Sequence, residues 1–309
     1  MNKIKFAINT LAFFAFSLVL AAVAQALPQT YVAMSGNDAN PCSFAAPCRT
    51  FKEALTKADA GGEVIAQETG IYGVLNITKA ISIIAPPGVH AEIAPQANVT
   101  AVTIQAGPQD VVLLRNLYLS GTGVNRAVDF KAGAELHVET CVVKGFNVGL
   151  FLGAPGLCYI KDTTIRNVRS GIRVTAPSGE ARAFIEHCRL EGYFEGVAAV
   201  NNANVVIRDS TLIGLSRDIN ITIGGILAVP TSGPISTIVV ENCLVSNNHF
   251  GLLALPSGSG ATIDVSQTMI SENGIGLYSF GPAQITSFGN NRFARNGFDG
   301  SFGLLNPLQ

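Results

Sequence analysis

Tryptophan is absent from this sequence of 309 residues, and charged side chains make up only 13% of it. Positive and negative charges nearly cancel, with 20 Lys and Arg against 21 Asp and Glu, and no stretch of the chain is markedly basic. A surface that binds nucleic acid needs a basic patch, so this composition argues against a nucleic-acid partner. Beyond Val23 there is also no apolar run close to the roughly 18 residues that a membrane span requires.

The one long apolar run lies at the N-terminus, and it has the form of an export signal. Lys3 and Lys5 provide a positive start, residues 6–23 are almost entirely apolar, and residues 24–26 (Ala-Gln-Ala) form a small-x-small cleavage site. The sequence therefore predicts a signal peptide at residues 1–26 and a secreted or periplasmic mature chain without a membrane span. A retained membrane anchor is the alternative, and the change in composition after the cleavage site argues against it.

The rest of the sequence contains an internal repeat. Eight segments share an apolar residue, two mostly polar residues and a small residue, and they begin 22 to 25 residues apart except for one interval of 33. These segments begin at Leu114, Val138, Ile160, Ile185, Ile207, Val240, Val265 and Phe288. A second block, a glycine before three mostly apolar residues, recurs at Gly149, Gly171, Gly196, Gly225, Gly251 and Gly276. A repeat of this length is typical of a solenoid.

Each repeat is expected to form one rung of three short strands. Apolar and polar residues alternate with a period of two, and the absence of helical periodicity excludes helical solenoids. The recurrent glycine opens the first strand, where the chain needs either a positive φ or a close backbone approach. The alternation slips between the second and third strands at residue types that tolerate a left-handed bend, namely Asn116, Asp162, Asp209 and Asn242. The 33-residue interval is expected to hold a loop at about residues 215–224.

Columns of equivalent residues test this register, because stacked rungs place them roughly 4.8 Å apart. The outward column before the bend alternates in charge through Arg115, Glu139, Lys161, Glu186, Arg208 and Glu241. The inward column after the bend consists of small residues, Cys141, Thr163, Cys188, Ser210, Cys243 and Thr268. We therefore expect these three cysteines to be buried fillers, and Cys158 to point inwards as well.

The segment before the repeats is expected to cap the solenoid. Cys42 and Cys48 flank a short loop, so an exported chain is expected to join them in a disulfide. Thr50 and Glu53 match a capping box that opens an amphipathic helix over residues 51–58. The chain thus divides into a signal peptide (residues 1–26), an N-terminal cap with the disulfide and the helix (residues 27–61) and a parallel β-helix (residues 62–309).

The cap and the first repeats also resemble a known group of proteins. Residues 31–42, 47–51, 62–65 and 77–83 are similar to the opening of exported bacterial right-handed β-helix repeat proteins, in the pectate-lyase-like superfamily. The resemblance implies an all-β, right-handed parallel β-helix in a periplasmic or extracellular setting. It implies no single activity, since this fold hosts lyases, hydrolases, epimerases and structural or adhesive proteins.

Motifs of the characterised enzymes with this fold are missing. The chain lacks the Asn-Thr-Asp, Asp-Asp, Gly-His-Gly and Arg-Ile-Lys set of polygalacturonases and the Asp-Pro-His-Asp motif of alginate epimerases. It also lacks the Asp-rich calcium clusters of pectate lyases, and no His stands at a known metal-ligand spacing from a Cys. We predict neither a metal nor a cofactor, and His187, at a bend position, is expected to be a turn residue.

One cluster on the outward face of the first strands has the residue types that polyuronate chemistry requires. Cleavage of a polyuronate needs a base and cations that offset the sugar carboxylate. We assign Arg173 as base or carboxylate clamp, Lys131 as a second clamp, Asp129 as a polar or ionic contact and Phe151 as a stacking platform. Three more charged residues, Arg126, Arg169 and Glu195, lie at the corner where these strands begin. The alternative is an ordinary solvated face with local salt bridges.

A second candidate surface lies on the outward face of the second strands. Its column is unusually apolar for an exposed face and contains Leu113, His137, Tyr159, Phe184, Val206 and Val239. Tyr159 and Phe184 are candidate substrate-binding residues, because aromatic rings on adjacent rungs can stack on sugars. The alternative is that neighbouring loops partly cover this column.

The function that the sequence favours is binding to a polysaccharide, a cell-surface glycan or another surface partner. The alternative is a polysaccharide lyase or glycoside hydrolase that acts on a polyuronate-like substrate, and a structural solenoid is a third possibility. Whether the protein is an enzyme is left open by the residues alone.

Overall fold

The computed structural model describes residues 29–123, 125–218, 220, 223–231, 235–256 and 260–305. The predicted signal peptide at residues 1–26 lies outside the described residues. Over the described ranges the chain forms one short helix, α2 (Phe51–Lys57), and three parallel sheets, named sheets A, B and C below. No helix in these ranges is long and apolar enough to cross a membrane.

The three sheets run along the length of the molecule, each built from one strand per rung. Sheet A contains β1 (Gln29–Val32), β2 (Gly62–Ala66), β5 (Ile81–Ile84), β8 (Val111–Arg115), β11 (Glu135–Glu139), β14 (Gly156–Lys161), β17 (Ala181–Glu186), β20 (Ala203–Arg208), β23 (Ser236–Glu241), β26 (Ala261–Ser266), β29 (Gln284–Ser287) and β31 (Leu304–Leu305). Sheet B contains β3 (Gly70–Ile71), β6 (Ala91–Ile93), β9 (Leu117–Ser120), β12 (Val142–Lys144), β15 (Thr164–Arg166), β18 (Arg189–Glu191), β21 (Thr211–Ile213), β24 (Leu244–Ser246), β27 (Met269–Ser271) and β30 (Arg292–Ala294). Sheet C contains β4 (Leu75–Ile77), β7 (Val102–Gln105), β10 (Arg126–Ala132), β13 (Val148–Leu152), β16 (Ser170–Val174), β19 (Glu195–Ala199), β22 (Gly224–Ala228), β25 (Phe250–Ala254) and β28 (Ile275–Ser279).

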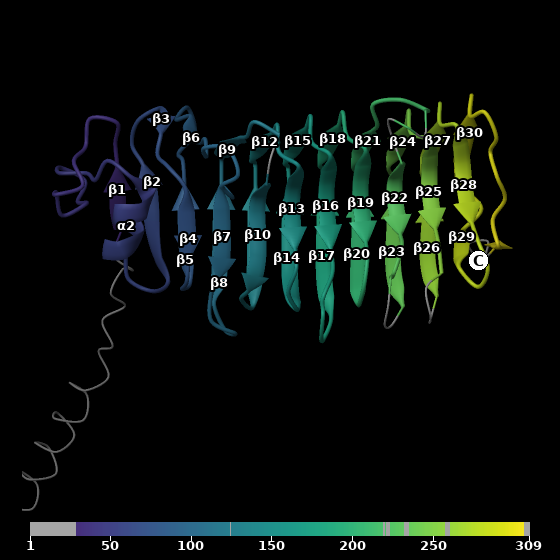
Figure 1. The fold of residues 1–309 in the computed structure, drawn as a ribbon, viewed down its shortest axis with the longest axis horizontal. Helices are drawn as coiled ribbons and strands as arrows, with labels where there is room; N and C mark the ends of the chain where they lie inside the picture. The colour runs from purple at the N-terminus through teal and green to yellow at the C-terminus, as the bar shows by residue number, and fades with distance from the viewer. Residues whose placement is uncertain are drawn as a thin grey trace, which may run out of the picture.

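The chain visits sheets C, A and B in turn, and consecutive rungs pair in parallel. Figure 1 shows the rungs side by side along the long axis, with α2 at the N-terminal end and β30 and β31 at the other. Inward residues of all three sheets form one continuous apolar core. The predicted parallel β-helix with three strands per rung is confirmed, and its first, second and third strands are those of sheets C, A and B.

The bend between sheets A and B is a column of left-handed residues. The predicted bend residues Asn116, Asp162, Asp209 and Asn242 have φ between 50° and 56°. Thr140, His187 and Gln267 occupy the same bend in the intervening rungs, with φ of 53°, 51° and 50°. The prediction that His187 is a turn residue is confirmed, because its backbone adopts the conformation of the Asn and Asp residues above and below it.

The recurrent glycines of sheet C are explained by close backbone approach. Neither Gly149, Gly171 nor Gly196 has a positive φ. A Cβ atom at Gly149 would lie 2.5 Å from the carbonyl oxygen of Gly171, and one at Gly171 would lie 2.5 Å from that of Gly196. A Cβ atom at Gly196 would lie 2.3 Å from the carbonyl oxygen of Gly225. Adjacent rungs therefore approach one another too closely here for any side chain.

The inward column of small residues is fully buried and hydrogen-bonded. The backbone N–H of Cys188 donates to the Ser210 hydroxyl at 3.0 Å, and the Cys188 thiol donates to the carbonyl of Glu186 at 3.2 Å. Burial raises the pKa of the Cys141, Cys188 and Cys243 thiols to about 12. Burial also raises the pKa of Cys158, the fourth free cysteine. The prediction of buried fillers is confirmed.

The disulfide and the helix of the N-terminal segment form as predicted, but the capping box does so only in part. The Thr50 hydroxyl accepts a hydrogen bond from the Glu53 N–H at 3.2 Å, and Cys42 and Cys48 are joined in a disulfide. The Thr50 N–H, however, donates to the carboxylate of Asp38 at 2.9 Å, so only half of the capping box forms. The inner face of α2 is buried, through Phe51, Ala54 and Leu55, and the helix ends at Lys57, one residue before the predicted end at Ala58. Strand β1, within the predicted cap, already pairs with β2 and extends sheet A.

The alternating charges before the bend lie in register on adjacent strands of sheet A. Arg115 pairs with Glu139 at 2.8 Å and Arg208 with Glu241 at 3.0 Å. The eighth repeat segment, in contrast, was placed wrongly by one residue at its start, whereas its last residue, Asn291, follows Thr268 in the column as predicted, since Met269 pairs with Arg292. Val265 pairs with Ser287 rather than with Phe288, because the extra residue is taken up in the following loop around Gly289, whose φ is 85°.

The predicted insertion is a loop between β21 and β22. Its described contacts lie at the corner that leads into sheet C, where the Arg217 carbonyl is 2.9 Å from the His249 ring nitrogen. The described part of the insertion therefore contacts the corner between sheets B and C.

Candidate functional site

The outward face of sheet C carries a continuous column that changes in character along the molecule. From the N-terminal end it runs through Asn76, Thr103, Asp129, Phe151, Arg173, Ala198, Leu227, Leu253 and Tyr278. Apart from Phe151, the part up to Arg173 is polar or charged, and the part after Arg173 is apolar or aromatic. The register that brought the predicted site residues together is confirmed.

Asp129 is enclosed by two cations. Its side chain is only 7% exposed, one carboxylate oxygen lies 2.8 Å from the Arg126 guanidinium, and the other lies 3.7 Å from the Lys131 ammonium. Both oxygens are therefore engaged within the protein. Asp129 is therefore placed to position Arg126 and Lys131 rather than to contact a ligand itself.

Phe151 lies flat against its own strand under an arginine. The Arg126 guanidinium carbon is 3.5 Å from the centre of the Phe151 ring, a cation–π contact. A Cβ atom at Gly153 would be 2.3 Å from the ring, so the ring occupies the space that this glycine leaves free. Since Arg126 covers one face of the ring, a sugar can stack on that face only if the guanidinium moves.

Arg173 forms an ion pair with Glu195, with 3.1 Å between nitrogen and oxygen. A guanidinium carries only N–H donors, in a planar fork that matches a carboxylate, so Arg173 is suited to clamp a carboxylate rather than to act as a base. Beside this pair is a groove of about 350 Å³ lined by Arg126, Asn147, Val148, Phe151, Arg169, Ser170, Arg173 and Glu195. We refer to it as the arginine groove.

The arginine groove has an excess of positive charge and an unused hydroxyl. Arg169 is exposed and has no carboxylate partner within the described chain, and its guanidinium lies 5.9 Å from the Phe194 ring. The Ser170 hydroxyl is buried and finds no hydrogen-bond partner among the described residues. The sequence placed Arg126 and Arg169 at this corner without a role. Arg126 is in register with Ser170, and Arg169 directly precedes Ser170, so both lie at the start of the strands that carry Asp129 and Arg173, and this nearness was the signal that could have assigned a role.

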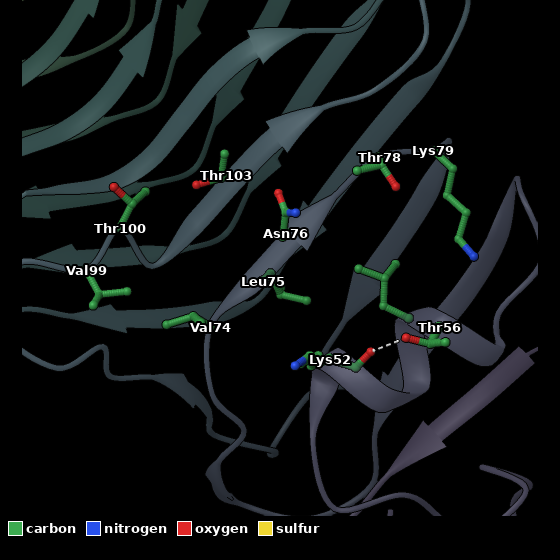
Figure 2. Close-up of a pocket in the computed structure, with 11 residues that line it drawn as sticks. Lys52, Thr56, Val74, Leu75, Asn76, Thr78, Lys79, Val99, Thr100 and Thr103 are labelled. Carbon is green, nitrogen blue, oxygen red and sulfur yellow. Dashed lines mark hydrogen bonds between the residues drawn. The ribbon is translucent and has the colours of Figure 1, made fainter.

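A second and larger groove continues the column at its N-terminal end. It measures about 640 Å³ and lies between α2 and strands β4 and β7. Figure 2 shows Asn76 and Thr103 on the strands and Lys52 on the helix, around the same space. Lys79, also at this groove, donates to the Ala58 carbonyl at the end of α2. The two grooves flank the Asp129 pair on one face of the solenoid.

The apolar part of the column forms a small core of its own outside the solenoid. Ala198, Leu227 and Leu253 point outwards but are buried together with Val200. Phe250 packs against them from the neighbouring column. These residues therefore close the C-terminal half of the face to a polar ligand.

On sheet A, the aromatic residues stack on one another. The His137 and Tyr159 ring centres are 4.8 Å apart with planes 23° from parallel, and those of Tyr159 and Phe184 are 5.4 Å apart at 17°. The ring faces are thus turned towards neighbouring rungs, and the edges face outwards. A substrate-binding role for Tyr159 and Phe184 remains a prediction, and the ring orientation gives a sugar no free face between them.

The described residues include no cluster of three or more His, Cys, Asp or Glu side chains arranged to hold a metal ion. The nearest approach to one is His187, whose ring nitrogens lie 3.7 Å from Asp162 and 3.8 Å from Asp209 in the bend column. All three side chains are about half exposed, which is typical of surface ion pairs.

Comparison with known proteins gives the same architecture. A family model described as a right handed beta helix region matches residues 104–298. The chain is similar to the solved structure of the pectate lyase Pel9A, with a TM-score of 0.52 and 14% identity over 88% of this chain and 78% of that one. A rhamnogalacturonan lyase structure is also similar, with a TM-score of 0.29 and 14% identity over 89% of this chain and 64% of that one. No curated protein sequence matches the chain.

At 14% identity, the likeness to the pectate lyase concerns the fold alone. The family match spans the rungs from β7 to just beyond β30. The predicted right-handed parallel β-helix is therefore confirmed, and the chain belongs to the family of proteins with a right-handed β-helix region.

Proposed function

We propose that this protein is exported and binds an acidic polysaccharide along the charged half of sheet C, from the groove beside α2 to the arginine groove. The observation that carries the proposal is the charge excess of that face. Around Asp129 and the arginine groove, four cations stand against two carboxylates, a local charge of +2 in a chain whose formal net charge is −1. A polymer with regularly spaced carboxylates would neutralise this excess.

The geometry of the rungs supports a polymeric ligand. Parallel rungs repeat roughly every 4.8 Å, so equivalent side chains form evenly spaced contacts along the axis. Arg173, Arg169 and Lys131 would bind carboxylates, and the buried Ser170 hydroxyl would gain the hydrogen bond that it lacks. Planar guanidinium groups suit carboxylates because they can donate two parallel hydrogen bonds.

Binding is favoured over catalysis by the state of the two candidate catalytic groups. Both oxygens of Asp129 contact cations, and Arg173 is paired with Glu195. Neither group is free to take a proton from a sugar carbon without rearrangement. A polyuronate lyase that uses the same face is the second candidate, since the fold is also that of a pectate lyase.

Retention on immobilised polygalacturonate, alginate and a neutral glucan tests the proposal. The purified mature protein should be retained by one or both acidic polymers and should pass through the neutral glucan. Arg173→Ala and Arg169→Ala should each weaken binding by about ten- to a hundredfold, because a hydrogen bond to a charged group contributes about 1.5–3 kcal/mol. Arg208→Ala on sheet A removes an equal charge, already paired with Glu241, and serves as the matched control.

Three results would change the proposal. Equal retention on the neutral glucan would contradict charge recognition. Unsaturated product that disappears in Arg173→Ala would replace binding by a lyase activity. Loss of binding in Tyr159→Ala or Phe184→Ala, with the arginine variants unaffected, would move the site to sheet A. Export is tested separately, by cell fractionation and by mass spectrometry of the mature N-terminus, which is expected at Leu27.

A further inference from the structure

Sheet B bears a cluster of side chains that the groove on sheet C does not involve. Ser120, Lys144 and Arg166 follow one another in a single outward column on β9, β12 and β15. Tyr118 is the outward residue next to Ser120 on β9. Two cations thus stand on adjacent rungs, beside a phenol.

These cations have no acidic partner within the described chain. Neither Lys144 nor Arg166 has an ion pair there, and the Nε atom of Arg166 is buried without a hydrogen-bond partner. Glu191, which follows Arg166 in the column, is bound by Arg189 at 2.8 Å. Glu92 accepts a hydrogen bond from the Ser120 hydroxyl instead. Two positive charges and one negative charge leave the cluster at +1.

Tyr118 connects the cations to a hollow in the surface. The interaction of its phenol with Lys144, and then with Arg166, lowers the pKa of Tyr118. The Lys144 ammonium is 4.9 Å from the centre of the Tyr118 ring, and the His90 ring centre is 4.5 Å from it. Beside the two rings is a hollow of about 270 Å³, also lined by Thr140.

We infer that this cluster is a second binding site, for a carboxylate-bearing sugar, with Lys144 and Arg166 holding the carboxylate and the Tyr118 and His90 rings forming a wall for the sugar ring. A monovalent carboxylate matches the local charge of +1, whereas a phosphate dianion would exceed it. The inference stands independently of the groove on sheet C, since the two sites lie on different sheets and share no residue.

The absence of tryptophan makes the tyrosines convenient probes, since the chain contains only six. The mature protein is titrated with sodium galacturonate, with galactose as the neutral analogue and with inorganic phosphate, while the phenol spectrum and saturation-transfer NMR are recorded. Galacturonate should change the phenol spectrum, and galactose should not. Tyr118→Phe should abolish the spectral change, and Lys144→Ala and Arg166→Ala should each weaken galacturonate binding about tenfold.

Two controls separate this site from the rest of the molecule. Arg292→Ala removes an exposed cation from the same sheet, at β30, and should leave the response unchanged. Arg208→Ala on sheet A, outside both proposed sites, should also leave the phenol response unchanged. A response that is lost in Arg173→Ala but kept in Lys144→Ala would assign the observed binding to sheet C and overturn the inference. An equal response to galactose, a response to phosphate but not to galacturonate, or normal affinity in both Lys144→Ala and Arg166→Ala would overturn the inference. If Arg166→Ala does not fold, Arg166→Lys, which keeps the positive charge but not the planar guanidinium, is titrated in its place.

Discussion

The three thiols of the inward column should make this solenoid sensitive to alkali. Burial raises the pKa of Cys141, Cys188 and Cys243 from the ordinary 9.0 to about 12. Above the ordinary value the unfolded chain loses its thiol protons while the native chain keeps them, so stability falls as the pH rises from 9.0 towards 12. At about pH 10 this difference amounts to about 4 kcal/mol for the three thiols together.

Replacement of the three cysteines by serine isolates this effect. Ser210 already occupies the same column, and its hydroxyl donates to the Arg208 carbonyl at 2.7 Å, as the Cys188 thiol does to that of Glu186 at 3.2 Å. Urea unfolding followed by circular dichroism is measured for both proteins at about pH 7 and about pH 10. Lysines and tyrosines titrate equally in the two proteins, so the difference between the two pH-dependent losses reports the thiols.

The wild-type protein should lose about 4 kcal/mol more stability than the serine variant between about pH 7 and about pH 10. A lower stability of the serine variant at neutral pH does not affect this comparison, because it cancels in the difference. Equal losses in the two proteins would refute the reasoning, since they would mean that the thiols ionise as readily in the native column as in the unfolded chain.

Three further predictions concern the scaffold. Gly171→Ala should destabilise the fold by about 1–3 kcal/mol in the same urea assay, because its Cβ would lie 2.5 Å from the Gly196 carbonyl oxygen. Gly73 has open space around it but a φ of 81°, so Gly73→Ala should lower the free energy of unfolding by about 1–2 kcal/mol through backbone strain alone. Thr50→Ala should cost about 1 kcal/mol by removing the cap of α2, with Thr50→Ser as the variant that restores the hydroxyl. Ellman's reagent should find none of the four free thiols in the native protein and all of them in denaturant, so rapid modification of the native chain would contradict their burial.

The features that the sequence predicted correctly are those that repeat in every rung. An in-register parallel stack places equivalent residues next to one another. Each side chain in a column must therefore fit, in size and charge, with the side chains on the rungs before and after it. The alternating charges from Arg115 to Glu241, the left-handed bend and the small inward residues all follow from that constraint. The disulfide between Cys42 and Cys48 was predictable for a different reason, the shortness of the loop between them.

The errors and omissions arose where the outcome depends on a local departure from the repeat or on side-chain direction. Phe288 was misplaced because one extra residue is accommodated near Gly289 without any change in the apolar pattern. The columns also placed Tyr159 and Phe184 side by side correctly, but a column does not show whether two rings meet face to face or offer a face to solvent.

The site on sheet B was missed for a related reason. Tyr118, Lys144 and Arg166 come from three successive rungs, and Tyr118 belongs to a different outward column from the two cations. Their contact runs diagonally across the sheet, along the direction of the tyrosine side chain. The strands of sheet B from β12 onwards are only three residues long, so a search for alternating patterns gives them little weight.

The two sheets together show why the unpaired cations call for a ligand. On sheet A the fold neutralises its outward charges by alternating them, as the pairing of Arg115 with Glu139 illustrates. On sheet B the same architecture places Lys144 next to Arg166, where like charges on neighbouring strands cost up to about 1 kcal/mol. An acidic residue at either position would remove that cost, as it does on sheet A. A ligand carboxylate bound between the two cations would take the place of that acidic residue, so binding would relieve a repulsion that the free protein retains.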